Sequence, residues 1–310
     1  MIPFGVTLEY VEAPPQLLGG DMTVCIGAIC NQKRIPGAIM IVHDVRVSYM
    51  ANGAMLGKHD LTSKLYQLPF GFAAAIAGTI PDCGKFISYL GEFMSQLPSG
   101  GDLQLDHIVF AARNASEQLV LSMFDSALVN NLGMTRNEWI NRQSDQVLKA
   151  EGRMLLQRVK PDASCLIAGF CQNRPLMLKV VSKNPPEEIP SHSAIGVGAI
   201  FALQKLSRRT QGPYCSIQRT ALAFSEGVRF ARQKGSGYVG PPAHCVILEP
   251  GLARQFDSKS DILRKWSKTI KPKDTHLLDA DEYWQEFSKT LIEVPRTNRQ
   301  AGSQTPETGK

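Results

Sequence analysis

The sequence predicts an α+β protein of four layers (αββα), in which two antiparallel sheets pack on each other and helices cover their outer faces. The first observation is the order of the elements. They run strands, helices, strands, helices and a strand, unlike the βαβ alternation of a parallel doubly wound sheet. The second is the segment 22–48, whose two strands are apolar on both faces and therefore belong inside a layered domain. With 310 residues, 43% of them hydrophobic, the chain can bury such a core.

Two pairs of strands come first. Apolar, β-branched runs on either side of a polar turn at 31–37 predict a β-hairpin over 22–48. A second pair is predicted over 64–69 and 72–78, on either side of a turn at Phe70-Gly71.

Helical patterns follow the strands. They predict helices over 83–97 and 102–130, and Gly133 ends the second of these. Thr135, followed three residues later by Glu138, forms a capping box and predicts a third helix that reaches about residue 159.

The second half repeats this order. Strands are predicted over 164–171, 176–181 and 243–248, and helices from 199 through Leu206 and over 215–232. The predicted organisation is an irregular leader at 1–21, one domain at 22–250, a helical extension at 251–294 with amphipathic pieces at 262–269 and 281–292, and a disordered tail at 295–310.

Composition excludes several classes of protein. No apolar run has the roughly 18 to 20 residues that a membrane span needs. The first 21 residues contain Glu9 and Glu12 but no basic residue, so they lack the start of a secretory signal. We therefore expect a cytoplasmic protein with no membrane partner.

The cysteines and histidines do not suggest a metal site or a cofactor. The seven cysteines include no C-x-x-C pair and sit mostly in apolar runs, which predicts buried free thiols. The six histidines are dispersed, and Gly235-Ser-Gly237 is too short for a phosphate loop. The net charge is +6, and its excess is concentrated at 254–273. A solvated helix face is expected there, with contact to an acidic partner as the alternative, and no nucleic-acid partner is predicted.

Four short patterns occur in an order that identifies a family. They are Thr23-Val24, Asp44-x-Arg46, Ser63-Lys64 and a hydrophobic strand that ends in Ala77-Gly78. In this order they resemble the N-terminal half of proteasome β subunits, and most closely HslV and the Anbu peptidases, which are N-terminal nucleophile (Ntn) hydrolases. The resemblance covers roughly residues 22–250, because 166–169, 194–198 and 232–237 also fall in the expected order.

The resemblance implies the four-layer Ntn-hydrolase sandwich and a role for each matched residue. Thr23 would be the nucleophile, and its own α-amine, which titrates near 7.7 to 8.0, would be the base. Lys64 would stabilise the alkoxide and the developing oxyanion, and Asp44 would orient that lysine. Supporting roles fall to Arg46, Ser63, Ser236 and Gly78, whose neighbourhood would supply the oxyanion hole.

The chain also departs from the family pattern. The turn between Thr23 and Asp44 is longer than usual, Gln233 replaces an expected aspartate, and Ala199 replaces an expected serine. Both replacements would weaken the polar network around the α-amine. Cys25 is not an alternative nucleophile, because it is neither terminal nor next to a candidate base.

Catalysis requires Thr23 to be the first residue of the mature chain. One route is autolysis of a propeptide of residues 1–22. The other, which we favour, is initiation at Met22 and removal of that methionine, since Gly19-Gly20-Asp21 can be encoded by a purine-rich ribosome-binding sequence. In that case residues 1–21 would not be translated.

The resemblance therefore predicts a threonine-type peptidase or amide hydrolase that needs no cofactor and assembles into a homo-oligomeric ring or partial ring. The alternative is a catalytically inactive, proteasome-like assembly subunit. An amidase for a small molecule would share the same site. The substrate, the ring size and any ATPase partner are left open by the sequence.

Overall fold

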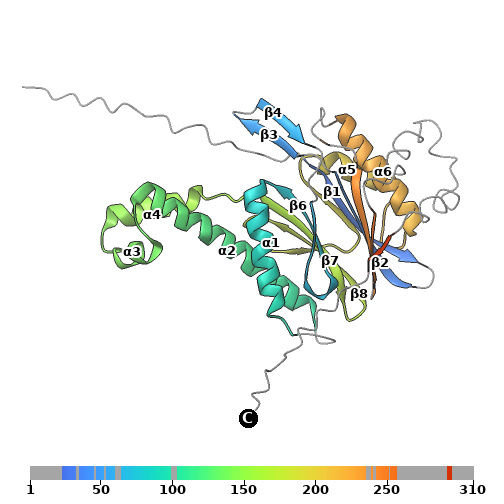
Figure 1. Cartoon of the computed structure of the whole chain (residues 1–310), viewed down its shortest axis with the longest axis horizontal. Helices are drawn as coiled ribbons and strands as arrows, with labels where there is room; N and C mark the ends of the chain where they lie inside the picture. The colour runs from blue at the N-terminus through green and yellow to red at the C-terminus, as the bar shows by residue number, and fades with distance from the viewer. Residues whose placement is uncertain are drawn as a thin grey trace, which may run out of the picture.

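The computed structural model describes residues 23–32, 35–44, 47–51, 54–59, 64–98, 103–234, 239, 242–250, 252–256 and 292–294. It confirms the predicted αββα class. Two antiparallel sheets, with strand orders β10-β1-β2-β11-β12-β13 and β5-β6-β7-β8-β9, pack on each other in the body of the molecule (Figure 1).

The first sheet is built on the predicted hairpin. Strands β1 (Cys25–Gln32) and β2 (Ile35–Asp44) pair antiparallel, with Cys25 opposite His43. Residues 23–30 and 38–44 of this hairpin and its start are all buried. Strands β10 (His192–Ile195) and β11 (Pro242–Glu249) flank the hairpin on its two sides.

The same sheet continues past the last strand predicted from the sequence. Strand β12 (Leu252–Phe256) pairs with β11, and β13 (Ile292–Val294) pairs with β12. The predicted helical extension over 251–294 is therefore wrong at β12 and at β13, which are strands. The amphipathic pieces predicted at 262–269 and 281–292 lie outside the described residues, apart from Ile292, as does the predicted tail.

The second sheet contains the other predicted strand pairs. Its strands are β5 (Leu65–Gln67), β6 (Ala73–Gly78), β7 (Ala163–Cys171), β8 (Arg174–Val181) and β9 (Glu187–Glu188), with the short 3₁₀ helix η1 (Pro69–Gly71) between β5 and β6. Gln172 and Asn173 both have positive φ in the tight turn between β7 and β8, which keeps that hairpin short. A further hairpin, β3 (Val47–Ala51) with β4 (Ala54–His59), was not predicted.

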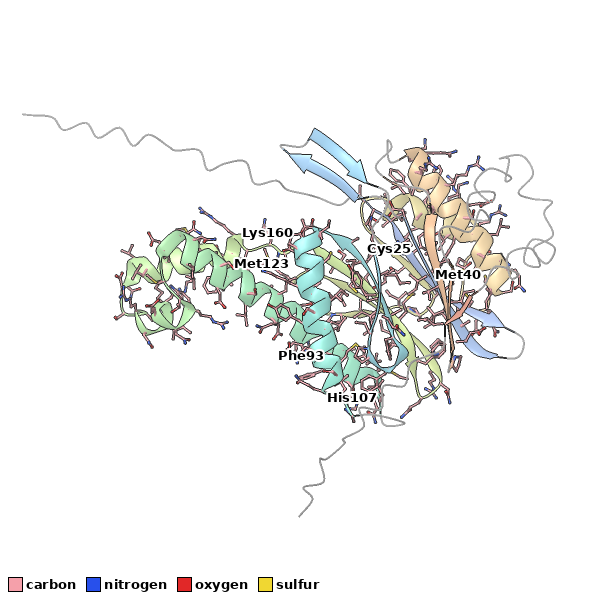
Figure 2. The ribbon with its side chains drawn as sticks, viewed as in Figure 1. Cys25, Met40, Phe93, His107, Met123 and Lys160 are labelled. Atoms are coloured by element: carbon pink, nitrogen blue, oxygen red, sulfur yellow. The ribbon has the colours of Figure 1, made fainter. Side chains whose placement is uncertain are left out.

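Helices cover the outer face of each sheet. Helices α1 (Ile80–Ser95) and α2 (Leu105–Leu132) lie on the second sheet, and α5 (Ala199–Arg208) and α6 (Ile217–Lys234) lie on the first (Figure 1). Three clusters of buried side chains fill the layers. One lies between α5–α6 and the first sheet, one between the sheets and one between the second sheet and α1–α2. Met40 belongs to the first cluster and Cys25 to the second, on opposite faces of the β1–β2 hairpin (Figure 2).

An arm of helices projects from the body. It consists of the C-terminal part of α2, then α3 (Arg136–Asn141) and α4 (Gln146–Arg158) (Figure 1). The arm has its own small core, made by Phe124, Leu128 and Val159 together with partly buried neighbours.

The predicted single helix from residue 135 to about 159 is wrong, because it is divided into α3 and α4. The capping box is real, since the Thr135 hydroxyl accepts from the Glu138 N–H and the Glu138 carboxylate accepts from the Thr135 N–H. However, α3 ends after two turns. Asp145 then caps a new helix by accepting from the N–H groups of Val147 and Leu148.

In the part of the chain that the structure describes, no helix is both long enough and apolar enough to cross a bilayer.

Candidate active site

Thr23 lies just before β1 and is fully buried. Its backbone is held by the Gly196-Val197-Gly198 segment, which joins β10 to α5. The Gly198 N–H donates to the Thr23 carbonyl oxygen at 3.1 Å. Gly196 has φ +89°, and a Cβ at this position would lie 2.3 Å from the same oxygen. Only glycine therefore allows this loop to approach Thr23 so closely.

Asp44 is the last residue of β2 and faces the chain at Thr23 and Val24. Its backbone N–H donates to the Val24 carbonyl at 3.1 Å, which continues the β1–β2 ladder. Its side chain is fully buried, and Oδ1 accepts hydrogen bonds from the Val24 N–H at 3.0 Å and from the Thr23 hydroxyl. The carboxylate thus fixes both the backbone and the side chain at the start of β1.

Lys64 comes from the other sheet. It lies directly before β5, and its carbonyl oxygen accepts from the Ile76 N–H of β6 at 3.0 Å. Its Nζ is 2.5 Å from Thr23 Oγ1 and 3.4 Å from Asp44 Oδ1, and the residue is only 3% exposed. A buried ammonium group is stable here because a carboxylate and a hydroxyl oxygen take its N–H bonds.

These three side chains form one hydrogen-bonded group. The Thr23 hydroxyl donates to Asp44 and accepts from Lys64. These two bonds use the single proton of the hydroxyl and one of its lone pairs. Thr23 and Asp44 belong to the first sheet and Lys64 to the second, so the group forms only when the two sheets pack. Such an arrangement places a positive charge beside a hydroxyl oxygen, where it stabilises an alkoxide.

Gly78 ends β6, two residues after Ile76. Its φ is +134°, and a Cβ here would lie 2.1 Å from the Asp162 carbonyl oxygen, which also accepts from the Thr79 N–H at 2.8 Å. The backbone at this point therefore requires glycine. The contribution of Gly78 to an oxyanion hole stays a prediction.

The remaining residues of the predicted site divide into two groups. Arg46, Ser63 and Ser236 lie outside the described residues. Ala199 is the first residue of α5, and Gln233 is exposed near the end of α6.

Cys25 is a core thiol, as predicted. It is fully buried, and its Sγ–H donates to the Ile76 carbonyl at 3.2 Å. Burial raises the pKa of this thiol well above its usual range, although the nearby Lys64 ammonium acts in the opposite direction. The thiol therefore stays protonated at physiological pH, which excludes it as the nucleophile.

Two features of the site were not singled out from the sequence. The resemblance includes the Gly196–Gly198 cradle, the segment that contacts the Thr23 carbonyl, but does not indicate this contact. No family pattern points to His43. Its fully buried ring lies with Nδ1 2.9 Å from the Asp44 carbonyl oxygen. A polar residue inside an otherwise apolar strand, directly before Asp44, was the available clue.

No set of three or more His, Cys, Asp or Glu side chains in the described segments is placed to hold a metal ion.

Comparison with known proteins gives a result for the fold only. No family model matches the chain, and no curated protein matches it in sequence. Among solved structures, it is similar to the Gly-1 mutant of Anbu from Hyphomicrobium sp. strain MC1, with a TM-score of 0.53 and 15% identity. That match covers 88% of this chain and 98% of the Anbu chain.

A second Anbu structure from the same organism matches with a TM-score of 0.50 and 14% identity, over 88% of this chain and 99% of the other. The fold predicted from the sequence is thereby confirmed: this chain has the fold of Anbu, a proteasome-like Ntn-hydrolase relative.

Proposed function

We propose that this protein is a threonine-type peptidase or amide hydrolase that uses Thr23 as its nucleophile after residues 1–22 are removed. The observation that carries the proposal is the position of Lys64 Nζ, 2.5 Å from Thr23 Oγ1, in a buried group that includes Asp44. A lysine buried against a hydroxyl oxygen has no evident value for folding, because well-packed apolar side chains serve a core at least as well.

The chemistry follows from these groups. The α-amine of the mature Thr23 takes the hydroxyl proton, directly or through a water, and Oγ1 attacks the carbonyl carbon of the substrate. The tetrahedral intermediate collapses as the amine returns its proton to the leaving nitrogen, which gives an ester on Thr23 and a free amine product. Water then attacks the ester with the same amine as base, and the acid product leaves.

Lys64 would stabilise the oxygen charge in each of these steps. Its ammonium contacts Thr23 Oγ1 directly. Asp44 holds the ammonium in this place, with Oδ1 3.4 Å from Nζ. The Asp44 carboxylate balances the charge of the ammonium within the buried site.

The first experiment determines whether Thr23 is exposed and reactive. The native gene and a gene shortened to begin at Met22 are expressed, and the N-terminus of each product is read by intact mass. Each product is then treated with a peptide epoxyketone, which reacts with a terminal threonine through both its hydroxyl and its amine. We expect a mature chain that begins at Thr23 and carries one adduct.

Matched variants make this test specific. Thr23→Ala should abolish the adduct, whereas Thr220→Ala, at another fully buried threonine in α6, should leave it in place. A mature chain that retains Met1, or an adduct that survives Thr23→Ala, would contradict the proposal.

The second candidate is a catalytically inactive assembly subunit with the same fold. The observation that favours it is the presence of Ala199 and Gln233 where the resemblance leads us to expect a serine hydroxyl and an aspartate carboxylate. A correctly processed chain that begins at Thr23 but forms no adduct would select this candidate.

Both candidates include self-association in the cytoplasm, as a ring or a partial ring. Native mass spectrometry of the processed protein tests this part of the proposal. A strictly monomeric species at micromolar concentration would count against it.

A further inference from the structure

The hydrogen bonds around Asp44 differ from those of a regular antiparallel ladder. Val24 lies opposite Asp44, one position beyond the Cys25–His43 pair. In a hydrogen-bonded pair of this kind, each residue donates its N–H to the carbonyl of the other. Here the Asp44 N–H does bond the Val24 carbonyl, but the Val24 N–H bonds the Asp44 carboxylate oxygen at 3.0 Å instead.

The Asp44 backbone carbonyl has a contact with the side chain of the preceding residue. The Nδ1 atom of His43 lies 2.9 Å from that carbonyl oxygen. A carbonyl oxygen only accepts, so Nδ1 must carry the proton.

We propose that His43 is a positioning residue for the group formed by Thr23, Asp44 and Lys64. Its Nδ1–H holds the Asp44 carbonyl, and the carboxylate is thereby left to take the Val24 N–H. In this position Oδ1 also accepts from Thr23 and lies 3.4 Å from Lys64 Nζ. The inference deepens the function proposed above and rests on it for its kinetic consequence, but not for its structural one.

The test compares three substitutions at this position. In His43→Asn the amide nitrogen lies close to the place of Nδ1 and keeps the donor. In His43→Gln it lies farther along the side chain, near the place of Nε2. His43→Leu has a similar volume and no donor. Melting temperatures of all three are measured first, so that a variant that fails to fold is recognised and the other two decide.

The kinetic measurement is the reaction of each processed variant with the epoxyketone, with the binding constant separated from the maximal rate of inactivation. We expect His43→Asn to react close to the wild-type rate. His43→Leu and His43→Gln should lose about tenfold to a hundredfold in the maximal rate, with binding unchanged, because the reacting groups are displaced by a fraction of an ångström to an ångström. Equal rates in the Asn and Leu variants would overturn the proposal.

Crystal structures of the wild type and of the Leu variant provide a measurement that does not depend on activity. In the Leu variant, the Val24 N–H should return to the Asp44 backbone carbonyl and the carboxylate should move away from Thr23. If the bond from Val24 to Oδ1 stays in place, His43 does not position Asp44. If the wild type forms no adduct, the proposed function fails by itself and this structural comparison still decides the role of His43.

Discussion

A substitution at Lys64 tests the chemistry proposed for the site. Removal of the ammonium in Lys64→Met should lower the rate of epoxyketone labelling about 10²- to 10³-fold, because the alkoxide and the oxyanion lose their nearest cation. Lys85→Met, at an exposed position of α1, is the matched control and should label as the wild type does. Equal labelling of both variants would show that Lys64 has no catalytic role.

The pH dependence of labelling tests the identity of the base. If the α-amine of Thr23 accepts the hydroxyl proton, it must be neutral, so the rate should rise with pH and level off above about 8. The measurement is the labelling rate of the processed protein between pH 6 and about 9. A rate that falls over this interval would point to a different base.

Gly196 is predicted to be essential for the placement of Thr23. Gly196→Ala puts a Cβ 2.3 Å from the Thr23 carbonyl oxygen and strains a backbone with φ +89°, at a cost of about 1 to 3 kcal/mol. We expect a lower melting temperature and a large loss of labelling. Gly212→Ala is the control, since a Cβ there meets no atom within 4 Å. Similar behaviour of the two variants would contradict a specific role for the Gly196–Gly198 cradle.

At the scale of the element, the arm depends on contacts that the body does not share. Trp139 of α3 packs edge to face on Phe124 of α2, with ring centroids 5.4 Å apart, and its Nε1–H donates to the Leu148 carbonyl at 3.0 Å. Gly152 of α4 lies against the same indole, because a Cβ at this position would be 2.2 Å from Trp139 Nε1. The turn between α3 and α4 is therefore shaped by one aromatic ring.

Gly152→Ala should loosen the arm and leave the body intact. The added methyl displaces Trp139, so we expect loss of hydrogen-exchange protection in α3 and α4 but not in β1 and β2. Gly84→Ala, in the open surface of α1, is the helical control and should stabilise by about 0.5 to 1 kcal/mol. Loss of protection throughout the chain would show that the arm and the body unfold together.

For the molecule as a whole, the burial of four thiols makes folding stability depend on pH. Cys30 and Cys245 lie between the first sheet and its helices, Cys25 lies between the two sheets, and Cys165 lies between the second sheet and its helices. Burial raises the pKa of all four, that of Cys30 to about 12. In the unfolded chain a thiol ionises near 8.5, so its neutral form is favoured by folding.

The sign of the stability effect follows from these pKa values. Below about pH 8.5 the thiol of Cys30 is protonated in both states and stability does not depend on it. Between that value and about 12 only the unfolded state loses the proton, so stability falls by about 1.4 kcal/mol per pH unit for this group. Urea unfolding at pH 8, 9 and about 10 measures the slope, which Cys30→Ala should reduce by that amount. An unchanged slope would show that this thiol is not kept neutral by the fold.

Local patterns in the sequence were enough for most elements. The apolar, β-branched runs predicted β1, β2, β6, β7, β8 and β11, since such runs are stable only as strands inside a layered core. Gly133 was predicted to end the second helix, and it does so as a left-handed cap with φ 63°. The order of these elements then gave the four layers, and the matched patterns around Thr23, Asp44 and Lys64 pointed to the fold that the Anbu structures share.

Other elements carry too little information of their own. The strands β12 and β13 are too short to show a clear period, and they form because β11 offers an edge to β12 and β12 offers an edge to β13. The fold of α3 back onto α4 includes the contact of Trp139 with Gly152, which no local pattern reveals.

The layers and the three residue types of the candidate site can be predicted from the chain alone, because they depend on apolar periodicity and on short local patterns. That Thr23, Asp44 and Lys64 form one buried hydrogen-bonded group, with Gly196 and His43 beside it, is visible only in the folded protein. These contacts join residues from two sheets and from segments far apart in the chain, so they exist only when all of those segments are packed together.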